Sequence, residues 1–381
     1  MNPFPATAVT ALKGLVLGDA FGAPFEYDKN APEHARKSLV EERYLDAVED
    51  VGQWPARGRV PGLYTDDGQQ ALALLHAWNL ATDPLDAVEV SRLFVQICRD
   101  MAQAPARDAR GWLGSFGLHR GTGSNFRDAI QTGKAPDTAG LGGAMRIGPV
   151  ATLLPDMATL VPWVVQVTGA TTTHPTGLAG AVLFALAAWR AAHYPWGLPS
   201  RDERQARWEE IRGDKSQRPE CVPAAQWNLF LRGSKIMNSG GEEALVKLGL
   251  DSGLSHKPFT VAANGFALTG VPWAIHHGLR APSFPAALYN VCSSGGDTDT
   301  VGAMAGCLAA LRLGADSIPG WMLAGIQGRE HIEDPHLWNP VVDERVLTEM
   351  EEDYRIEQVK QYSPPACIPV PKGDKKRKRR R

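Results

Sequence analysis

Residues 178–192 read LAGAVLFALAAWRAA, an alanine-rich run with few β-branched residues that predicts a helix. A second run of this kind, TVGAMAGCLAALRL, occupies 300–313. Residues 6–18 and 68–80 place their Ala, Leu and Val side chains at helical spacing. Alternating strand-like patterns are rare, and only PWVVQVTG at 162–169 is ambiguous between helix and strand. The sequence therefore predicts an all-α protein.

Glycine-rich segments interrupt the helical pattern, but none resembles a long flexible linker. They lie at 18–22, 111–123, 140–148 and 293–302. Residues 194–225 are rich in Pro, Arg and Glu and predict a surface excursion. We expect a single large helical domain over 1–345, followed at 346–381 by an acidic, Pro-rich segment and a disordered basic tail.

The composition is that of a soluble globular protein. Of 381 residues, 44% are apolar, enough for a substantial core, and 22% are charged. No stretch approaches the ~20 consecutive apolar residues that a membrane helix needs, and the first residues lack the pattern of a secretory signal. Five scattered cysteines have neither zinc-site nor dithiol spacing. We therefore expect reduced thiols, a cytoplasmic location and no membrane association.

The net charge of −2 hides a basic end. Residues 372–381, KGDKKRKRRR, carry eight Lys or Arg and one Asp, so the remaining chain has a net charge of −9. Such a tail could contact nucleic acid or an anionic surface, because clustered cations release counterions from phosphates. It could equally be a solvated, disordered end. It does not define the function.

Two acidic motifs stand where predicted helices begin. Thr65-Asp66-Asp67 precedes the helix over 68–80, and Gly295-Gly296-Asp297-Thr298-Asp299-Thr300 precedes the helix over 300–313. Asp and Thr at such positions can simply cap a helix, but a helix end favours one anion by only ~0.3–1 kcal/mol. If the motifs converge, their carboxylates repel one another unless cations are bound. Oxygen donors of this kind select Mg²⁺ or Mn²⁺. Spacing alone cannot prove convergence.

The motifs occur in the order seen in the ADP-ribosylglycohydrolase family, which the chain resembles. The matching pieces are GLVLGDAFGAPFE (14–26), YTDDGQQALAL (64–74), GGAMRIGPV (142–150), TTTHP (171–175) and SSGGDTDTVGAMAG (293–306). They span about three quarters of the chain, and TDD paired with GGDTDT is the most specific of them. The resemblance implies an all-α fold with a cleft that holds two Mg²⁺ ions, with Mn²⁺ as the other candidate.

The resemblance also assigns roles to residues. The metal ligands would be Thr65, Asp66, Asp67, Asp297, Asp299 and Thr300. The catalytic candidates would be Glu26, which matches an acid beside the scissile bond, and the metal-bound Asp67 and Asp299. The candidate substrate contacts would be Gly114, Phe116, Gly121, Gly123, Gly143, Met145, Arg146 and His174.

Three departures from the family pattern bear on activity and specificity. Gly68 stands where a Thr usually follows the first motif, and Leu141 stands where an Asn often precedes Gly-Gly-Ala-Met-Arg. The loop GSFGLHR at 114–120 has no Asp, although some arginine-directed members carry one in the loop that it resembles.

Four residues have two readings each. Asp19 could close the first helix or support a metal-bound water. Gly18, Gly22 and Pro24 indicate that this helix ends before Glu26, which could be a solvated loop acid or a catalytic one. His174 could be structural or could orient a metal-binding Asp. Arg146 could bind a phosphate or be structural.

The function expected from the resemblance is Mg²⁺-dependent hydrolysis of the glycosidic bond between ADP-ribose and a modified protein side chain. The metals would orient the ribose hydroxyls and a water, while Glu26 or a metal-bound aspartate assists proton transfer. The alternative is a non-catalytic member of the fold that binds ADP-ribose or serves a structural role. Which side chain carries the ADP-ribose stays open.

Overall fold

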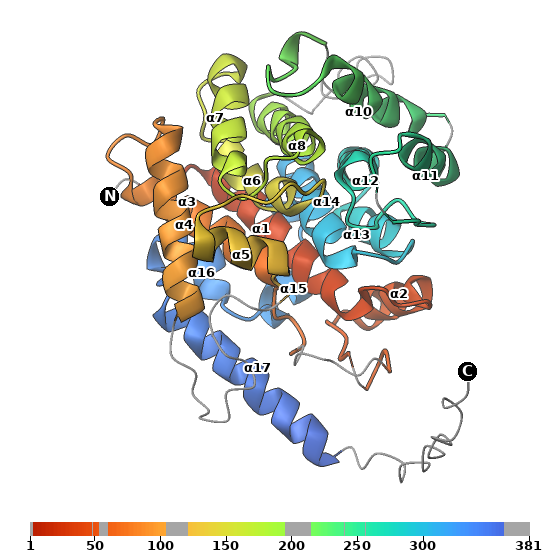
Figure 1. Ribbon diagram of the computed structural model, residues 1–381. Helices are drawn as coiled ribbons and strands as arrows, with labels where there is room; N and C mark the ends of the chain where they lie inside the picture. Colours follow the sequence, from red (N-terminus) through yellow and green to blue (C-terminus); the bar gives the residue numbers. More distant parts are fainter. Residues whose placement is uncertain are drawn as a thin grey trace, which may run out of the picture.

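The computed structural model describes residues 3–47, 49–52, 60–103, 121–194, 215–239, 241–255 and 257–361. Over these ranges the chain is helical and has no β-strand, which confirms the all-α prediction (Figure 1). The helices in chain order are α1 (Ala6–Gly22), α2 (Ala31–Glu41), α3 (Asp66–Leu80), α4 (Ala87–Gln103), α5 (Ser124–Thr132), α6 (Gly142–Ala151), α7 (Met157–Gly169), α8 (Pro175–His193), α10 (Ala224–Ile236), α11 (Gly241–Asp251), α12 (Ala267–Arg280), α13 (Phe284–Cys292), α14 (Thr298–Leu313), α15 (Gly320–Gly325), α16 (Arg329–Glu333) and α17 (Val342–Gln361).

The ambiguous stretch at 162–169 belongs to the helix α7. Its apolar side chains Leu160, Trp163, Val164 and Val167 recur at helical spacing and are buried. The carboxylate of Asp156 caps the first turn by accepting a hydrogen bond from the backbone N–H of Thr159 at 2.8 Å. Helical spacing together with a cap therefore decides in favour of a helix.

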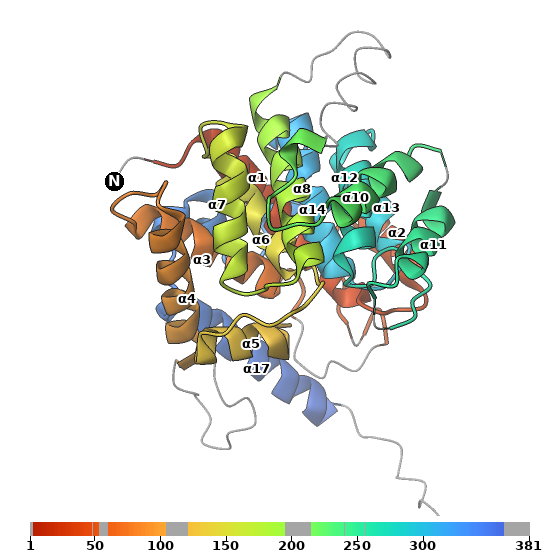
Figure 2. The ribbon, with the colours of Figure 1, turned by 45° about the horizontal axis from the view of Figure 1, so that its top comes forward.

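Two of the glycine-rich segments lie within helices, contrary to the prediction that they interrupt them. Residues 18–22 complete α1, and most of 140–148 belongs to α6. The reason is tight helix packing, since α1 and α14 lie side by side at the centre of the body (Figure 2). A Cβ atom at Gly14, Gly18 or Gly22 would lie 2.1–2.3 Å from a backbone oxygen of α14.

The end of α1 follows the prediction. The helix stops at Gly22, and a short 3₁₀ helix, η1 (Ala23–Phe25), carries the chain to Glu26. Because α1 is locked against α14, Glu26 at the end of η1 comes close to the first turn of α14. The second acidic motif is in that turn.

Two segments have the length and hydropathy of a membrane span, namely 6–25 and 175–193. In these windows 83% and 89% of the residues are buried inside the protein. The helix α8 packs against α6, α7, α12 and α14, and α1 packs against α14 and α6. Their apolar composition is therefore accounted for by the core of this helical body.

The C-terminal helix α17 runs from Val342 to Gln361 and crosses the expected domain boundary at 345 (Figure 1). Its first turns are joined to the body, because Glu344 is fully buried and Leu347 is 5% exposed. The basic tail and residues 195–214 of the expected surface excursion lie outside the described residues.

Candidate active site

A cavity of about 310 Å³ lies where the first turns of α3, α6 and α14 meet the segment after η1. It is lined by both acidic motifs, through Asp66 and Asp67 on one side and Asp297, Asp299 and Thr300 on the other. The two motifs are thus parts of one site, although more than 200 residues separate them in the sequence. Thr65 is buried beside the cavity but does not line it.

The first motif is held by a buried carboxylate from another helix. Thr65 is the N-cap residue of α3, yet its side chain makes no capping hydrogen bond. Instead, both carboxylate oxygens of Asp19 accept a hydrogen bond from the backbone N–H of Thr65 at 2.9 Å, and one also accepts from the N–H of Gly68 at 2.9 Å. The backbone carbonyl oxygen of Asp19 accepts the N–H of Ala23, the C-cap of α1, and Asp19 does not line the cavity. It supplies the cap of α3 and leaves the side chains of the motif available.

The second motif depends on a tight turn before α14. Gly295 and Gly296 have positive φ angles of 72° and 85°, a conformation that favours glycine. A Cβ at Gly296 would lie 1.7 Å from the carbonyl oxygen of Ala263. The backbone N–H of Asp297 donates to that same oxygen at 2.7 Å. The paired glycines therefore place Asp297 at the N-cap of α14, where its side chain makes no capping hydrogen bond.

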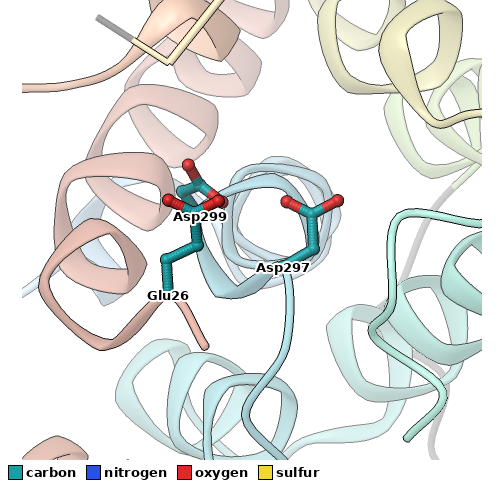
Figure 3. A group of neighbouring side chains, drawn as sticks. All are labelled: Glu26, Asp297 and Asp299. Carbon is teal, nitrogen blue, oxygen red and sulfur yellow. The ribbon is translucent and has the colours of Figure 1, made fainter. Parts of the chain in front are cut away.

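Carboxylates from both ends of the chain converge in this cavity. Oxygens of Glu26, Asp297 and Asp299 all lie within 4.8 Å of one another (Figure 3). The hydroxyl of Thr300 lies 3.5 Å from Oδ2 of Asp67, which links the second motif to the first. Helix capping does not explain this arrangement, because the acids face one another across the cavity.

Burial is the main cause that raises the pKa of Asp67, Asp297 and Asp299 above that of an ordinary aspartate, to about 6 for Asp297. Neighbouring carboxylates add to the shifts, Asp19 at Asp67 and Glu26 at Asp299. Burial and the neighbouring carboxylates therefore disfavour the ionised form of these aspartates. A bound cation would relieve this repulsion.

The donor set fits a hard divalent cation. All candidate donors are carboxylate or hydroxyl oxygens, the ligands that Mg²⁺ and Mn²⁺ prefer. In addition, Oδ1 of Asp67 is buried and has no hydrogen-bond partner. A buried carboxylate oxygen without a partner is costly. Coordination of a cation would satisfy it.

Arg146 lines the cavity but is only 1% exposed. Its guanidinium donates to the side-chain carbonyl of Gln70 at 2.7 Å and to the hydroxyl of Thr171, and it lies 4.9 Å from the ring centroid of Phe94. Gln70 in turn donates to Oδ2 of Asp66 at 2.6 Å. Because protein groups already bind the guanidinium, these contacts favour a structural role for Arg146. In that role the buried cation holds the side chain of Gln70, which in turn holds the carboxylate of Asp66.

The remaining predicted substrate contacts fall into three groups. Four of them line the cavity: Gly121, Gly123, Gly143 and Met145. Two, Gly114 and Phe116, lie outside the described residues. His174 is not among the lining residues, because it is the N-cap of α8 and its Nδ1 accepts the N–H of Thr176 at 3.1 Å.

Two departures from the family pattern have local causes. A Cβ at Gly68 would lie 2.6 Å from the ring of Tyr64, so this ring occupies the space that a larger residue would need. Leu141 lines the cavity and packs on Gly270, where a Cβ would lie 2.9 Å from a methyl group of Leu141. In both places an apolar group or a glycine takes the place of a polar side chain.

Several lining residues were not assigned from the sequence, among them Tyr27, Gln70, Phe126 and Thr172. Gln70 lies one turn after Asp66 on the same helix, and that spacing was a usable signal. Tyr27 gave none, because its place follows from a positive φ of 57° and from its N–H donating to the carbonyl oxygen of Gly296 at 2.8 Å.

Comparison with known proteins identifies the family of the chain. A family model described as ADP-ribosylglycohydrolase matches residues 4–355. The ADP-ribosyl-[dinitrogen reductase] glycohydrolase of Rhodospirillum rubrum is 25% identical over 317 residues, which are 83% of this chain and 88% of that protein. The ADP-ribosylhydrolase ARH3 of Bos taurus is 27% identical over 345 residues, 84% of this chain and 89% of that protein.

A solved structure named ADP-ribosylglycohydrolase-related protein complex has the same fold, with a TM-score of 0.50 at 21% identity over 91% of this chain and 98% of that one. The family match covers nearly the whole helical body and contains both acidic motifs, Glu26 and Arg146. The chain belongs to the ADP-ribosylglycohydrolase family.

Proposed function

We propose that this protein hydrolyses the glycosidic bond between ADP-ribose and a protein side chain, and so reverses mono-ADP-ribosylation. The observation that carries the proposal is the convergence of Glu26 and both acidic motifs on one cavity. A purely structural protein gains nothing from gathering carboxylates that repel one another. The relatives point the same way, since one of them is named for an ADP-ribosylated protein substrate.

The acidic motifs would hold the cofactor, two Mg²⁺ or Mn²⁺ ions. The candidate ligands are Thr65, Asp66, Asp67, Asp297, Asp299 and Thr300. When bound, such ions orient ribose hydroxyls and a water and offset negative charge. Thr65 and Thr300 also form hydrogen bonds to another residue of the site. Their hydroxyls lie 3.3 Å and 3.5 Å from Oδ2 of Asp67. Oδ1 of Asp67, which has no hydrogen-bond partner, would then be available to a cation.

Glu26 would move the proton of the reaction. It lines the cavity, is partly exposed, and follows a short 3₁₀ helix rather than lying inside a packed one. A carboxylate placed there can take a proton from the attacking water or deliver one to the leaving group as oxocarbenium-like charge develops. The glycines 121, 123 and 143, with Met145, would border the ADP-ribose.

The decisive test is a hydrolysis panel on the full chain with Arg-, Ser- and Asp/Glu-linked mono-ADP-ribosylated proteins. We expect turnover of at least one linkage, in the presence of Mg²⁺ or Mn²⁺ and not after chelation. Tight binding of ADP-ribose without turnover of any linkage would refute the hydrolase and favour a non-catalytic ADP-ribose-binding protein. An Asp299→Ala variant serves as the matched inactive control.

A further inference from the structure

Glu344 is a buried carboxylate that joins the C-terminal helix to the first acidic motif. It lies in the first turn of α17 and is 0% exposed. Its Oε1 accepts hydrogen bonds from the hydroxyl of Tyr64 at 2.7 Å and from the indole N–H of Trp338 at 3.0 Å. Its Oε2 accepts from the side-chain amide of Gln69 at 2.7 Å. Such charge-assisted hydrogen bonds are among the strong ones in proteins.

Two of these donors flank the first motif in the sequence. Tyr64 immediately precedes Thr65, and Gln69 follows two residues after Asp67. Both are 0% exposed, and their side chains are held by one carboxylate that lies about 275 positions further along the chain. The turn that carries Thr65, Asp66 and Asp67 is therefore held at both of its ends.

The ring of Tyr64, which Glu344 holds through the hydroxyl, also packs against the backbone of α3. It packs so closely on Gly68 that a Cβ there would lie 2.6 Å from the ring. Asp19 holds the same turn as well, because its carboxylate accepts hydrogen bonds from the N–H groups of Thr65 and Gly68. Two buried carboxylates, Asp19 and Glu344, thus hold the turn, and neither of them lines the cavity.

We propose that Glu344 is a positioning residue of the metal site. The first turn of α17 would then help to set the geometry of the active site. This rests on the proposed function, in that Asp66 and Asp67 are taken to bind the cation. Loss of the carboxylate would leave Tyr64, Gln69 and Trp338 with buried donors to satisfy again, and the motif would lose its fixed geometry. Substitution of groups that orient metal ligands typically weakens metal binding about 10–100-fold.

The test is calorimetric titration of Mn²⁺ into the metal-stripped full chain, with melting temperature measured in parallel. We expect Glu344→Ala to weaken Mn²⁺ binding by about 10–100-fold. Glu344→Gln, which keeps an accepting carbonyl oxygen, should recover part of the loss. Tyr64→Phe keeps the ring and removes only the hydroxyl, so it should weaken binding by a smaller factor. The Tyr64→Phe variant also tests the proposal if Glu344→Ala fails to fold.

Leu347→Ala is the matched control. It lies one turn further along α17 and is 5% exposed, so it removes packing and no hydrogen bond to the motif. We expect it to lower the melting temperature and to leave the Mn²⁺ affinity within about twofold. Wild-type affinity in Glu344→Gln and Tyr64→Phe, or an equal loss in Leu347→Ala, would overturn the positioning role. Failure of the wild-type protein to bind Mn²⁺ would instead overturn the proposed metal site itself.

Discussion

Replacing Gly18 by alanine tests whether the close contact of α1 with α14 sets the geometry of the site. The added Cβ would lie 2.1 Å from the carbonyl oxygen of Gly302, whereas ordinary contact begins near 3.4 Å. The two helices must therefore separate by roughly 1.3 Å, the difference between these distances. The obstacle is backbone on the partner helix, so no side chain can rotate away from it.

Two contributions to the free energy of unfolding oppose each other in Gly18→Ala. The gain in helix propensity is smaller than the cost of overpacking. Alanine stabilises a helix by about 1 kcal/mol relative to glycine. Overpacking a core costs typically about 1–3 kcal/mol, and a clash with backbone belongs at the upper end. We therefore expect a net loss of about 2 kcal/mol, which lowers the melting temperature by about 3 °C for a helical body of this size. A shift near 1 Å also exceeds the ~0.2 Å tolerance of metal–ligand distances, so Mn²⁺ affinity should fall at least tenfold.

Differential scanning calorimetry and Mn²⁺ titration measure both effects. Gly169→Ala at the end of α7 is the control, because nothing lies within 4 Å of a Cβ there. It should leave stability unchanged or raise it by up to about 1 kcal/mol. If Gly18→Ala matches the wild-type protein in melting temperature and in Mn²⁺ affinity, the reasoning about the helix contact is wrong.

Four further outcomes are expected. Chelation should abolish hydrolysis and lower the melting temperature, and Mg²⁺ or Mn²⁺ should restore both; full activity of metal-free protein would contradict the metal site. In the metal-free protein, burial raises the pKa of Asp297 from 3.8 to about 6, so the folded state binds this proton more tightly than the unfolded state. The stability from this group is present below pH 3.8 and is lost as the pH rises through 6, by at most about 3 kcal/mol; melting curves of Asp297→Asn should show a weaker pH dependence than those of the wild-type protein, because Asp67 and Asp299 still contribute. Glu26→Gln should keep bound metal while turnover falls about 10²–10⁴-fold, whereas Asp299→Ala should lose metal and turnover together, as metal analysis and single-turnover rates would show. A chain that ends at Pro371 should keep its turnover on a small ADP-ribosylated substrate, and loss of salt-dependent nucleic-acid binding with the tail would show a separate role for 372–381.

Local patterns made the helices and the acidic motifs predictable from the sequence. The spacing of apolar residues is a property of each segment, so α3, α8 and α14 begin and end within a few residues of their predicted bounds. The TDD and GGDTDT motifs are short and lie at helix starts, as predicted. Their convergence could not be derived from spacing, since it depends on how α1, α3 and α14 pack.

The supporting residues were less visible because their partners are distant in the sequence. Asp19 contacts Thr65, and Glu344 contacts Tyr64, over 46 and 280 positions. Nothing in the residues around Asp19 shows that it caps a different helix. The sequence leaves Arg146 undecided between a phosphate contact and a structural role, and its burial and its hydrogen bond to Gln70 favour the structural role. The sequence pattern predicts that the glycines at 18 and 22 interrupt a helix, because a single sequence does not show that a second helix lies against them.

The contact between Gly18 and Gly302 also has a consequence for the order of events during synthesis. The two residues are 284 positions apart, and at about 5–20 residues per second the ribosome needs roughly 15–60 s to make that stretch. Throughout this time α1 has no α14 to cover its glycine face, and Glu26 has neither Asp297 nor Asp299 beside it. The proposed metal site therefore cannot assemble on the nascent chain until α14 has emerged. We expect ion capture to follow the closing of this helix pair, and the uncovered α1 to be a binding site for chaperones until then.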